Sequence, residues 1–556
     1  MSGAERLIYL PLGGAGEVGM NAYVYGWGAP GKERLILVDL GVTFPDMDTT
    51  PGVDLIFPDM SWLIERADRL EAIVITHGHE DHIGGIAHFW QELRAPVYCR
   101  RFTGHLARAK MEERGNDPEQ VHVVEPFPAV LEAGPFGISF LPVSHSIPES
   151  SALVIDTPAG RVVHTGDFKL DGAPVVGEPF NAELWHEVAA DGVKALVCDS
   201  TNVFVETPGR SESTLVNNIA DLVRKSSGMF VATTFASNIA RVKTLAEAGH
   251  AAGRSVCLMG RAMLRMVQAG RETGVLADFP PVIGHEEAED LPRENLMLIV
   301  TGSQGERRAA TAQLSRGKYL GLELAEGDTF LFSSKTIPGN ERGVLRIVNA
   351  FSERGVNVVD DSSSLYHVSG HANRPDLEAV HELMRPEMLI PMHGEHRMLR
   401  RHAEAGEAAG IVSIIATNGT MLDLSGARPV VCEHVETGRV YLDGVLKIGA
   451  LDGVVRDRIR MALNGHVMLS VIIDEDDEPL GEPWAEVTGL AETGRSGAPL
   501  VERIEAEGAQ FLSRAADKVL IDDDKLESGL RRAVRQVAVE EIGKKPEVTV
   551  VISRLA

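Results

Sequence analysis

Short runs of hydrophobic residues, rich in β-branched side chains and separated by glycine-containing turns, dominate the first 200 positions of the chain. Runs of this length and composition predict β-strands. The predicted strands cover residues 7–12, 35–39, 72–76, 137–143, 152–156, 161–165 and 195–198. A helical pattern starts near Asp81, continues through IGGIAHFWQEL and ends before Pro96. We therefore expect residues 1–210 to form the first part of a strand-rich domain.

The pattern changes after residue 210, where amphipathic stretches alternate with apolar runs. SESTLVNNIADLVRKS precedes MFVATTF, and SNIARVKTLAEAGHAAG precedes SVCLMG. Helices separated by strands at this spacing indicate crossovers in a parallel sheet. Because single cores stop growing near roughly 250–300 residues, a chain of 556 residues needs several domains. Residues 211–359 are predicted to be a separate α/β domain.

Polar residues that suit chemistry reappear late in the chain, in LYHVSGHA and MLIPMHGE. Residues 360–430 are therefore predicted to return to the first domain, and residues 431–460 to connect it with the rest. A small α+β domain is predicted over 461–556, with the strands HVMLSVIID and VTVVISRL. This tail carries a net negative charge, which excludes a basic RNA-binding arm.

Composition restricts the classes of function. A net charge of −26 argues against indiscriminate binding to nucleic acid or to an anionic membrane, but leaves room for a local basic channel or a bound metal. Four cysteines without a CxxC pair exclude a disulfide framework and a thiolate zinc finger. No signal peptide and no apolar run of about 18 residues is found, so we expect a cytoplasmic protein without a membrane partner.

The most specific motif is THGHEDH, directly after the apolar run EAIVI. It places His77, His79, Asp81 and His82 within six residues. Such a group is costly to bury without partners, whereas neutral imidazoles and a carboxylate suit Zn²⁺ or Mn²⁺. Gly78 lets the backbone bend so that the flanking histidines converge. The motif predicts a metal site, and a polar turn with coincidental histidines is the weaker interpretation.

Three further candidates follow the ends of apolar runs, where α/β sheets place their ligands. His145 follows ISFLPVS, Asp167 follows RVVHTG and His393 follows MLIPM. Alone, each of them is as well explained by an ordinary hydrogen bond. Together with the motif they make seven ligands, enough for two divalent metal ions with open positions, a geometry used on phosphoesters and amides.

At this point the sequence resembles the β-CASP branch of the metallo-β-lactamase superfamily, and within it the bacterial ribonuclease J family. The resemblance covers essentially the whole chain. It rests on THGHEDHIGG together with GGAGEVGMN, VDLGVTFP, DSTN, TFASNIARV, TGSQGE, IPGNE and LYHVSGHA. It implies a metallo-β-lactamase αββα sandwich with an inserted β-CASP α/β domain and a small C-terminal α+β domain.

The resemblance also implies a role for each ligand. His77, His79 and His145 hold one metal, Asp81, His82 and His393 hold the other, and the catalytic Asp167 bridges them. The metals are expected to be Zn²⁺, with Mn²⁺ or Mg²⁺ as alternatives.

Outside the metal ligands, the resemblance assigns His371 to the scissile phosphate or to protonation of the leaving oxygen. Hydrogen bonding to a ligand is the plainer role for His371. Asp199 is implied to orient a neighbouring ligand.

Substrate contacts implied by the family lie in two segments. Ser237 and Asn238 form one, although both residue types are also ordinary helix caps. The second comprises His367, Val368, Ser369, Gly370 and His371. Both are expected to contact RNA and its 5′-monophosphate. The basic residues available for an RNA groove are Arg241, Arg261, Arg265, Arg307 and Arg308. For each of them alone, a position on a solvent-exposed helix face is the simpler explanation.

The sequence is thus interpreted as a ribonuclease that degrades RNA from the 5′ end, with internal cleavage also expected. Its implied roles are rRNA processing, RNA maturation and mRNA decay. Its implied partners are RNA, a dimer or tetramer of the same chain, and other RNA-decay proteins. One alternative is a hydrolase of a small thioester or lactone, which is disfavoured because such an enzyme would not need the 211–359 insertion. Another alternative is a non-catalytic scaffold subunit, which is disfavoured because such a protein would not need all seven ligands.

Overall fold

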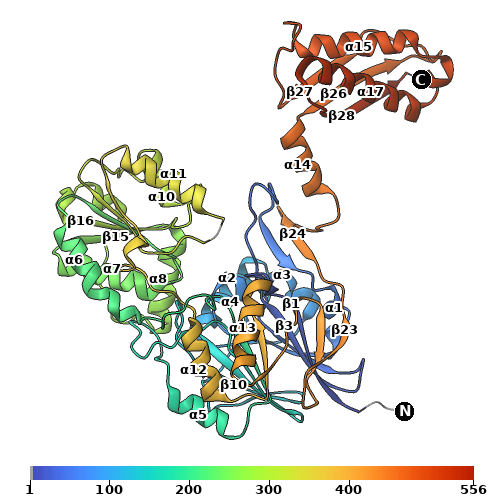
Figure 1. Cartoon of the computed structure of the whole chain (residues 1–556). Coiled ribbons are helices and arrows are strands. Elements are labelled where there is room, and N and C mark those ends of the chain that lie inside the picture. The colour runs from blue at the N-terminus through green and yellow to red at the C-terminus, as the bar shows by residue number, and fades with distance from the viewer. Residues whose placement is uncertain (1–3, 338, 556) are drawn as a thin grey trace. The chain divides into compact units, whose positions relative to one another are not determined.

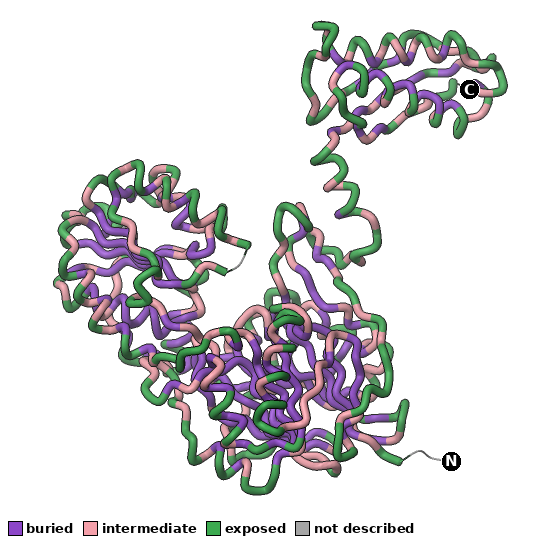
Figure 2. Tube along the Cα trace, viewed as in Figure 1, coloured by how far each residue is buried: buried purple, intermediate pink, exposed green. Residues whose placement is uncertain are grey.

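The computed structural model describes residues 4–337 and 339–555, and the chain divides into two compact units (Figure 1). The first unit contains the chain up to Thr43 and Phe57–Gly438, and the second contains Phe44–Ile56 and the chain from Arg439 onward. Buried residues gather along the strands of each unit, so each has a core of its own (Figure 2).

Two sheets lie face to face in the first unit. In spatial order, one sheet contains β23 (Val430–His434), β22 (Thr420–Asp423), β1 (Arg6–Gly13), β3 (Ala22–Gly28), β4 (Arg34–Val38), β6 (Leu70–Val74), β7 (Val97–Cys99) and β8 (Val121–Val123). The other contains β21 (Val412–Ser413), β19 (Met388–Met392), β13 (Ala195–Asp199), β12 (Gly160–His164), β11 (Ser151–Thr157), β10 (Phe136–Pro142) and β9 (Leu131–Ala133). Alternate residues of both sheets share one core, among them Tyr25, Val74, Phe140, Val162 and Ile390.

Helices cover the outer faces of this sandwich. Trp185 of α5 (Ala182–Ala190) and Val380 of α12 (Arg374–Met384) pack on the second sheet, where α13 (His396–Ala408) lies against β19. On the first sheet, α4 (Arg101–Glu113) packs on β7 and β8, and α3 (Ile86–Leu93) packs on α4. The expected αββα sandwich is therefore confirmed.

The inserted region forms a five-stranded parallel sheet, again as expected. Its spatial order is β15 (Ser255–Met259), β16 (Leu296–Val300), β14 (Phe230–Thr233), β17 (Thr329–Phe332) and β18 (Asn357–Val359). One face is covered by α6 (Val216–Lys225), α7 (Ile239–Ala251) and α8 (Arg261–Thr273). The other is covered by α9 (His285–Glu289), α10 (Ala310–Arg316) and α11 (Glu341–Ser352). The insertion lies between β13 and β19, which pair directly in parallel.

One predicted element is different in the structure. The helix expected from Asp81 to Pro96 consists of α2 (Glu80–Ile83) and α3, with a break at Gly84 and Gly85. The N–H of Gly85 donates to the carbonyl of Leu40, a residue of another loop. The chain therefore bends at the glycine pair, and the periodicity of apolar residues does not reveal this.

The second unit contains a three-stranded sheet, with spatial order β27 (Trp484–Thr488), β26 (His466–Ile473) and β28 (Glu547–Arg554). It packs against α15 (Leu500–Arg514) and α17 (Asp523–Ile542) around a core that includes Leu469, Ile504 and Leu530. Upstream, β24 (Arg439–Asp443) and β25 (Leu446–Gly449) form a hairpin, followed by α14 (Val454–Asn464). The stretch expected to be a connector thus contains regular structure.

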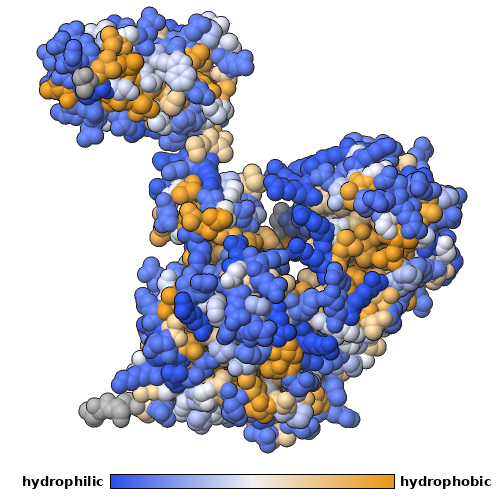
Figure 3. All heavy atoms as spheres, turned by 180° about the vertical axis from the view of Figure 1, so that it is seen from behind, coloured by the Kyte–Doolittle hydropathy of each residue, from blue (hydrophilic) through white to orange (hydrophobic). Residues whose placement is uncertain are grey.

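The surface in Figure 3 is largely hydrophilic, with separate hydrophobic areas on each unit. Among the described residues, no helix combines the length and the apolar character needed to cross a membrane.

Candidate metal centre

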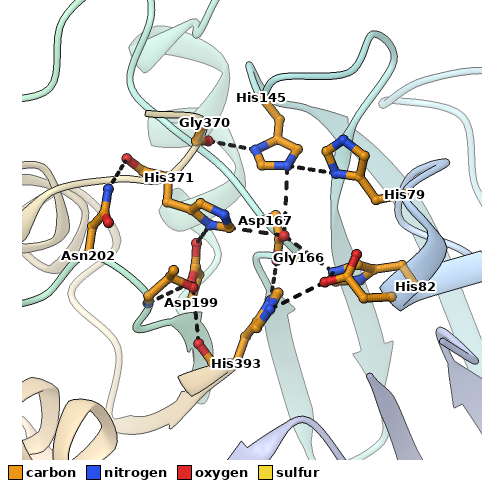
Figure 4. A network of polar contacts seen from close by, with 12 residues as sticks. His79, His82, His145, Gly166, Asp167, Asp199, Asn202, Gly370, His371 and His393 are labelled. Atoms are coloured by element: carbon orange, nitrogen blue, oxygen red, sulfur yellow. Dashed lines mark hydrogen bonds and ion pairs between the residues drawn. The ribbon is translucent and has the colours of Figure 1, made fainter. Parts of the chain in front are cut away.

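All seven proposed ligands converge at one edge of the sandwich, and Figure 4 shows His79, His82, His145, Asp167 and His393 among them. The segments that carry them follow the ends of β6 in one sheet and of β10, β12 and β19 in the other, so the two facing sheets bring them together. They form two overlapping groups of four residues, and Asp167 belongs to both. The first group is His77, His79, His145 and Asp167, and the second is Asp81, His82, Asp167 and His393.

In the first group, ring nitrogens point at one another. Nε2 of His77 and Nε2 of His145 each lie 3.1 Å from Nδ1 of His79. Oδ2 of Asp167 is 3.8 Å from Nε2 of His77 and 3.7 Å from Nε2 of His145. A divalent cation between these atoms could accept a lone pair from each ring nitrogen and from the carboxylate oxygen at the same time. The first group is therefore suited to bind a metal ion.

The second group surrounds the same carboxylate from the other side. Nε2 of His82 lies 3.3 Å from Oδ2 of Asp167 and 3.6 Å from Oδ2 of Asp81. Nε2 of His393 lies 3.5 Å from Oδ2 of Asp81, and its Nδ1 contacts Oδ1 of Asp167. Oδ2 of Asp167 therefore faces histidines of both groups and Oδ1 faces His393, so this carboxylate lies where a bridging ligand would be needed.

Protonation states in the centre suit metal binding. Burial lowers the pKa of His77, His79 and His145, for His79 to about 4, so these rings are neutral and their lone pairs are available. Burial opposes ionisation of Asp167 as well, but the positive charges of His393 and His82 hold its pKa well below the ordinary value. The first group is thus supplied with neutral imidazoles and an ionised carboxylate. In the second group burial lowers the pKa of His82 and His393, but nearby carboxylates, Asp167 foremost, outweigh it and raise the pKa of both rings, so these two histidines would release a proton when a metal binds.

A third group places His371 beside the centre. Its Nδ1 lies 2.8 Å from Oδ2 of Asp199 and 4.0 Å from Oδ2 of Asp167. Burial lowers the pKa of His371, but the carboxylates of Asp199 and Asp167 outweigh it and raise the pKa to about 9. Asp199 itself is fixed by the hydroxyl and the N–H of Thr201, both of which donate to Oδ1. The partner that Asp199 orients is therefore His371.

Several supporting residues carry no metal-binding pattern of their own. The buried Asp39 accepts hydrogen bonds from the N–H and hydroxyl of Thr76, and its Oδ2 lies 2.7 Å from Nδ1 of His82. Asn21 donates to the carbonyl of Asp81, and its Oδ1 accepts from Tyr23. These contacts set the orientation of His82 and the motif loop. The segments VDLG and GGAGEVGMN belong to the family resemblance, but their spacing alone does not indicate this role.

The segment 367–371 runs along the centre and is tied to it through backbone. Nδ1 of His145 donates to the carbonyl of Gly370, which fixes the ring so that Nε2 faces the ligands. A Cβ at position 370 would lie 3.0 Å from Cε1 of His145, so glycine is required for this approach. Ser369 Oγ accepts hydrogen bonds from Asn202 and from the N–H of His371, and Val368 is buried in the core of the insertion.

The other candidate substrate residues form the turn before α7, and Nη1 of Arg241 in this helix lies 3.4 Å from Nδ1 of His367. Asn238 caps α7, with Oδ1 accepting from the N–H of Arg241, and Ser237 directly precedes it. Burial first, and then the positive charges of Arg241, Lys335, Lys169 and Arg210, lower the pKa of His367 to about 3. Arg241 and Lys169 are paired with Glu212 and Asp171, so Arg210 and Lys335 are the cations near His367 without an ion pair among the described residues.

The expectation that Arg241 is available to an RNA groove is wrong. Its guanidinium is fully buried and pairs with Glu212 through two of its nitrogens, while Nη1 donates to the carbonyls of Ser333 and Tyr366. Arg265 pairs with Glu113 at 3.1 Å. Arg261, Arg307 and Arg308 are exposed.

Family models match nearly all of the first unit and most of the second. The metallo-β-lactamase superfamily matches residues 15–218, the ribonuclease J β-CASP domain 227–351, the Zn-dependent metallo-hydrolase RNA specificity domain 355–416, and the ribonuclease J C-terminal domain 453–555. The fold is also seen in a crystal structure of a protein of unknown function from Enterococcus faecalis V583, with 17% identity, a TM-score of 0.52, and coverage of 76% of this chain and all of that one. Fold and ligand groups together define a metallo-hydrolase of the metallo-β-lactamase superfamily with a β-CASP insertion.

Relatives that match along the full length of the chain identify the family within this class. The chain is 40% identical to ribonuclease J of Sinorhizobium meliloti, over 100% of this chain and 98% of that protein. It is 35% identical to ribonuclease J of Mycolicibacterium smegmatis, over 97% and 95%. The chain belongs to the ribonuclease J family.

Proposed function

We propose that this protein is a two-metal ribonuclease that degrades RNA in the 5′-to-3′ direction from a 5′-monophosphate end and also cleaves internally. The observation that carries the proposal is the pair of ligand groups that share Asp167. A paired-metal clamp of this kind is suited to displacement at a phosphodiester. Family membership directs the proposal to RNA.

We assign His77, His79 and His145 to one metal, Asp81, His82 and His393 to the other, and Asp167 to both. Zn²⁺ fits a set of imidazoles and carboxylates, and Mn²⁺ or Mg²⁺ are the alternatives. Two such cations would lower the pKa of a water and balance the charge that develops on the phosphate. Asp39 would hold His82 in the tautomer that presents Nε2 to the centre, because Nδ1 contacts the carboxylate.

His371 is assigned to the leaving oxygen. Its Nδ1 is held by Asp199, and among the described residues its Nε2 has no partner. The ring can therefore present an N–H to substrate from a fixed position, as a general acid does. Asp199 acts through His371 by holding the ring and favouring its protonated form.

The 5′ end is assigned to the region of His367. We assign segment 367–371 and the 237–238 turn to its border, and Arg210 and Lys335 to its positive charge. A terminal monophosphate carries more charge than an internal phosphodiester, so it gains more from this region. That difference would favour 5′-monophosphorylated RNA.

We further propose that the chain forms a dimer or tetramer through the region 461–556 and acts with other RNA-decay proteins in rRNA processing, RNA maturation and mRNA decay. We assign the metallo-β-lactamase domain to residues 1–210 and 360–430, the β-CASP domain to residues 211–359 and the linker to residues 431–460.

The test uses one RNA sequence prepared with a 5′-monophosphate, a 5′-triphosphate or a 5′-hydroxyl. With Mn²⁺ or Zn²⁺ we expect mononucleotides to appear first from the monophosphorylated RNA, and no products when a chelator is added. His79→Ala is the matched inactive control, while a chromogenic thioester tests the alternative hydrolase. Cleavage of the thioester but of none of the RNAs would refute the proposal.

A further inference from the structure

Five arginines gather on the face of the five-stranded sheet that α10 and α11 cover. They are Arg307, Arg308, Arg316, Arg342 and Arg346. Residues 305–320 and 341–350, which contain them, carry six basic and two acidic side chains, in a chain with 54 basic and 80 acidic ones. The local charge is therefore opposite in sign to that of the whole protein.

These arginines are exposed and lack partners. Among the described residues, none of the five guanidinium groups has a hydrogen-bond acceptor or a carboxylate within reach, whereas in the same insertion Arg224 pairs with Asp221 and Arg293 with Asp328. The two acidic residues of these segments are occupied elsewhere. Glu306 accepts from the N–H of Gln304, and Glu341 accepts from that of Gly339. The positive charge is thus not neutralised from within.

Three of the arginines line a cavity of about 240 Å³ between α10 and α11. Arg307 comes from the loop before α10, Arg316 from its last turn, and Arg346 from the middle of α11. Small residues form much of the lining, including Gly305, Ala312 and Gly343. A Cβ at Gly305 would lie 2.7 Å from the backbone of Gly343, so the close approach of the two segments depends on glycine. No carboxylate lines the cavity.

Phosphate groups are the ligands that this cavity fits best. Guanidinium forks bind phosphate oxygens in a bidentate manner, and three arginines line this cavity, with no carboxylate among its described lining residues. No aromatic side chain lines the cavity, so bases have nothing to stack on. Contacts with the phosphate backbone position a nucleic acid without reading its sequence.

We infer that the α10–α11 surface, defined by Arg307, Arg316 and Arg346, is a second RNA-binding site that holds the phosphodiester backbone of long substrates away from the metal centre. This inference rests on the proposed ribonuclease function. It adds a site that short RNAs do not reach, so the site contributes to affinity for long RNA and not to the chemical step.

The test compares full-length wild-type protein with Arg307→Gln/Arg316→Gln/Arg346→Gln. Binding and cleavage are measured on a monophosphorylated RNA of a few nucleotides and on a long single-stranded RNA. We expect the affinity for long RNA to fall about tenfold or more, and the slope of log K against log salt to become shallower by about two, since each phosphate contact with a single strand contributes about 0.7. Cleavage of the short RNA should keep its rate.

Two matched variants isolate the site. Arg224→Gln/Arg400→Gln/Arg401→Gln removes the same charge from arginines that pair with carboxylates, and should bind both RNAs as the wild type does. Arg307→Lys/Arg316→Lys/Arg346→Lys keeps the charge and should retain most of the affinity.

Three outcomes would overturn the inference. One is unchanged affinity and salt slope on long RNA. A second is an equal loss on short and long RNA. A third is a change of oligomeric mass in light scattering with RNA affinity intact, which would assign the surface to contacts between copies of the chain. If the wild-type protein neither binds nor cleaves RNA, the proposed function itself fails.

Discussion

At the scale of single residues, His371 is the most direct test of the proposed chemistry. Loss of its N–H should slow cleavage by about 10²–10⁴, the usual contribution of general acid catalysis, so we expect His371→Ala to show this decrease in kcat. Metal content, measured by mass spectrometry, should stay at the wild-type level because His371 is outside both groups of four ligands. Loss of metal from this variant would move His371 into the coordination sphere and contradict the assignment.

Arg241 and Glu212 make a buried ion pair whose partners lie in different parts of the chain. Glu212 lies at the start of the insertion, whereas Arg241 lies in α7 and also donates to the carbonyl of Tyr366, beyond the end of the insertion. Arg241→Met leaves the carboxylate buried and unpaired, so we expect a loss of about 3–5 kcal/mol in the free energy of unfolding, measured in urea.

Arg224→Met is the control for this prediction. Its pair with Asp221 is exposed, and its loss should cost less than about 1 kcal/mol. Equal effects of the two substitutions would mean that the Arg241 pair does not stabilise the junction.

At the scale of elements, the sequence predicts what depends on local pattern. The seven predicted strands correspond to β1, β4, β6, β10, β11, β12 and β13, with ends that differ by at most two residues. β7, β8 and β9 have only three residues each, too few to show alternation. The ligand motif is visible because metal-binding residue types cluster in six positions. The roles of Asp39 and the carbonyl of Gly370 are not visible, since each depends on contacts far away in sequence.

Two buried histidines join α12 and α13 and should make stability sensitive to acid. The rings of His381 and His402 stack with centroids 5.1 Å apart, and Ser200 Oγ lies 2.9 Å from Nδ1 of His402. Burial lowers the pKa of both, for His381 to about 4. In the unfolded chain a histidine has a pKa of about 6.5. Below that pH the unfolded chain binds protons that the folded protein does not bind. The free energy of unfolding therefore decreases as the pH is lowered, by up to about 1.4 kcal/mol per pH unit for each histidine.

Thermal unfolding between about pH 7 and about pH 5 measures this effect, with chelator present so that metal loss does not contribute. His381→Phe keeps a stacked ring without a titrating group and should show a weaker dependence on pH than the wild type. Identical slopes would show that this pair is not the cause.

At the scale of the whole molecule, the metal-binding groups found among the described residues all lie in the first unit. Among the described residues of the second unit, none belongs to a group that could hold a metal ion. Truncation after Asp452 keeps the β24–β25 hairpin and removes the region that matches the ribonuclease J C-terminal domain. We expect a lower mass in light scattering and unchanged metal content. A truncated protein with the full-length oligomeric state would place the assembly surface elsewhere.

The parallel pairing of β13 with β19 has a consequence for how this protein is made. Every ligand of the first metal group lies before residue 168, but the second group is complete only when His393 has been synthesised and β19 has joined the sheet beyond the insertion. A nascent or prematurely terminated chain that ends before β19 therefore lacks a finished centre. We therefore expect the proposed two-metal activity to begin only after most of the chain has been synthesised, so that the emerging chain does not act on the message that encodes it.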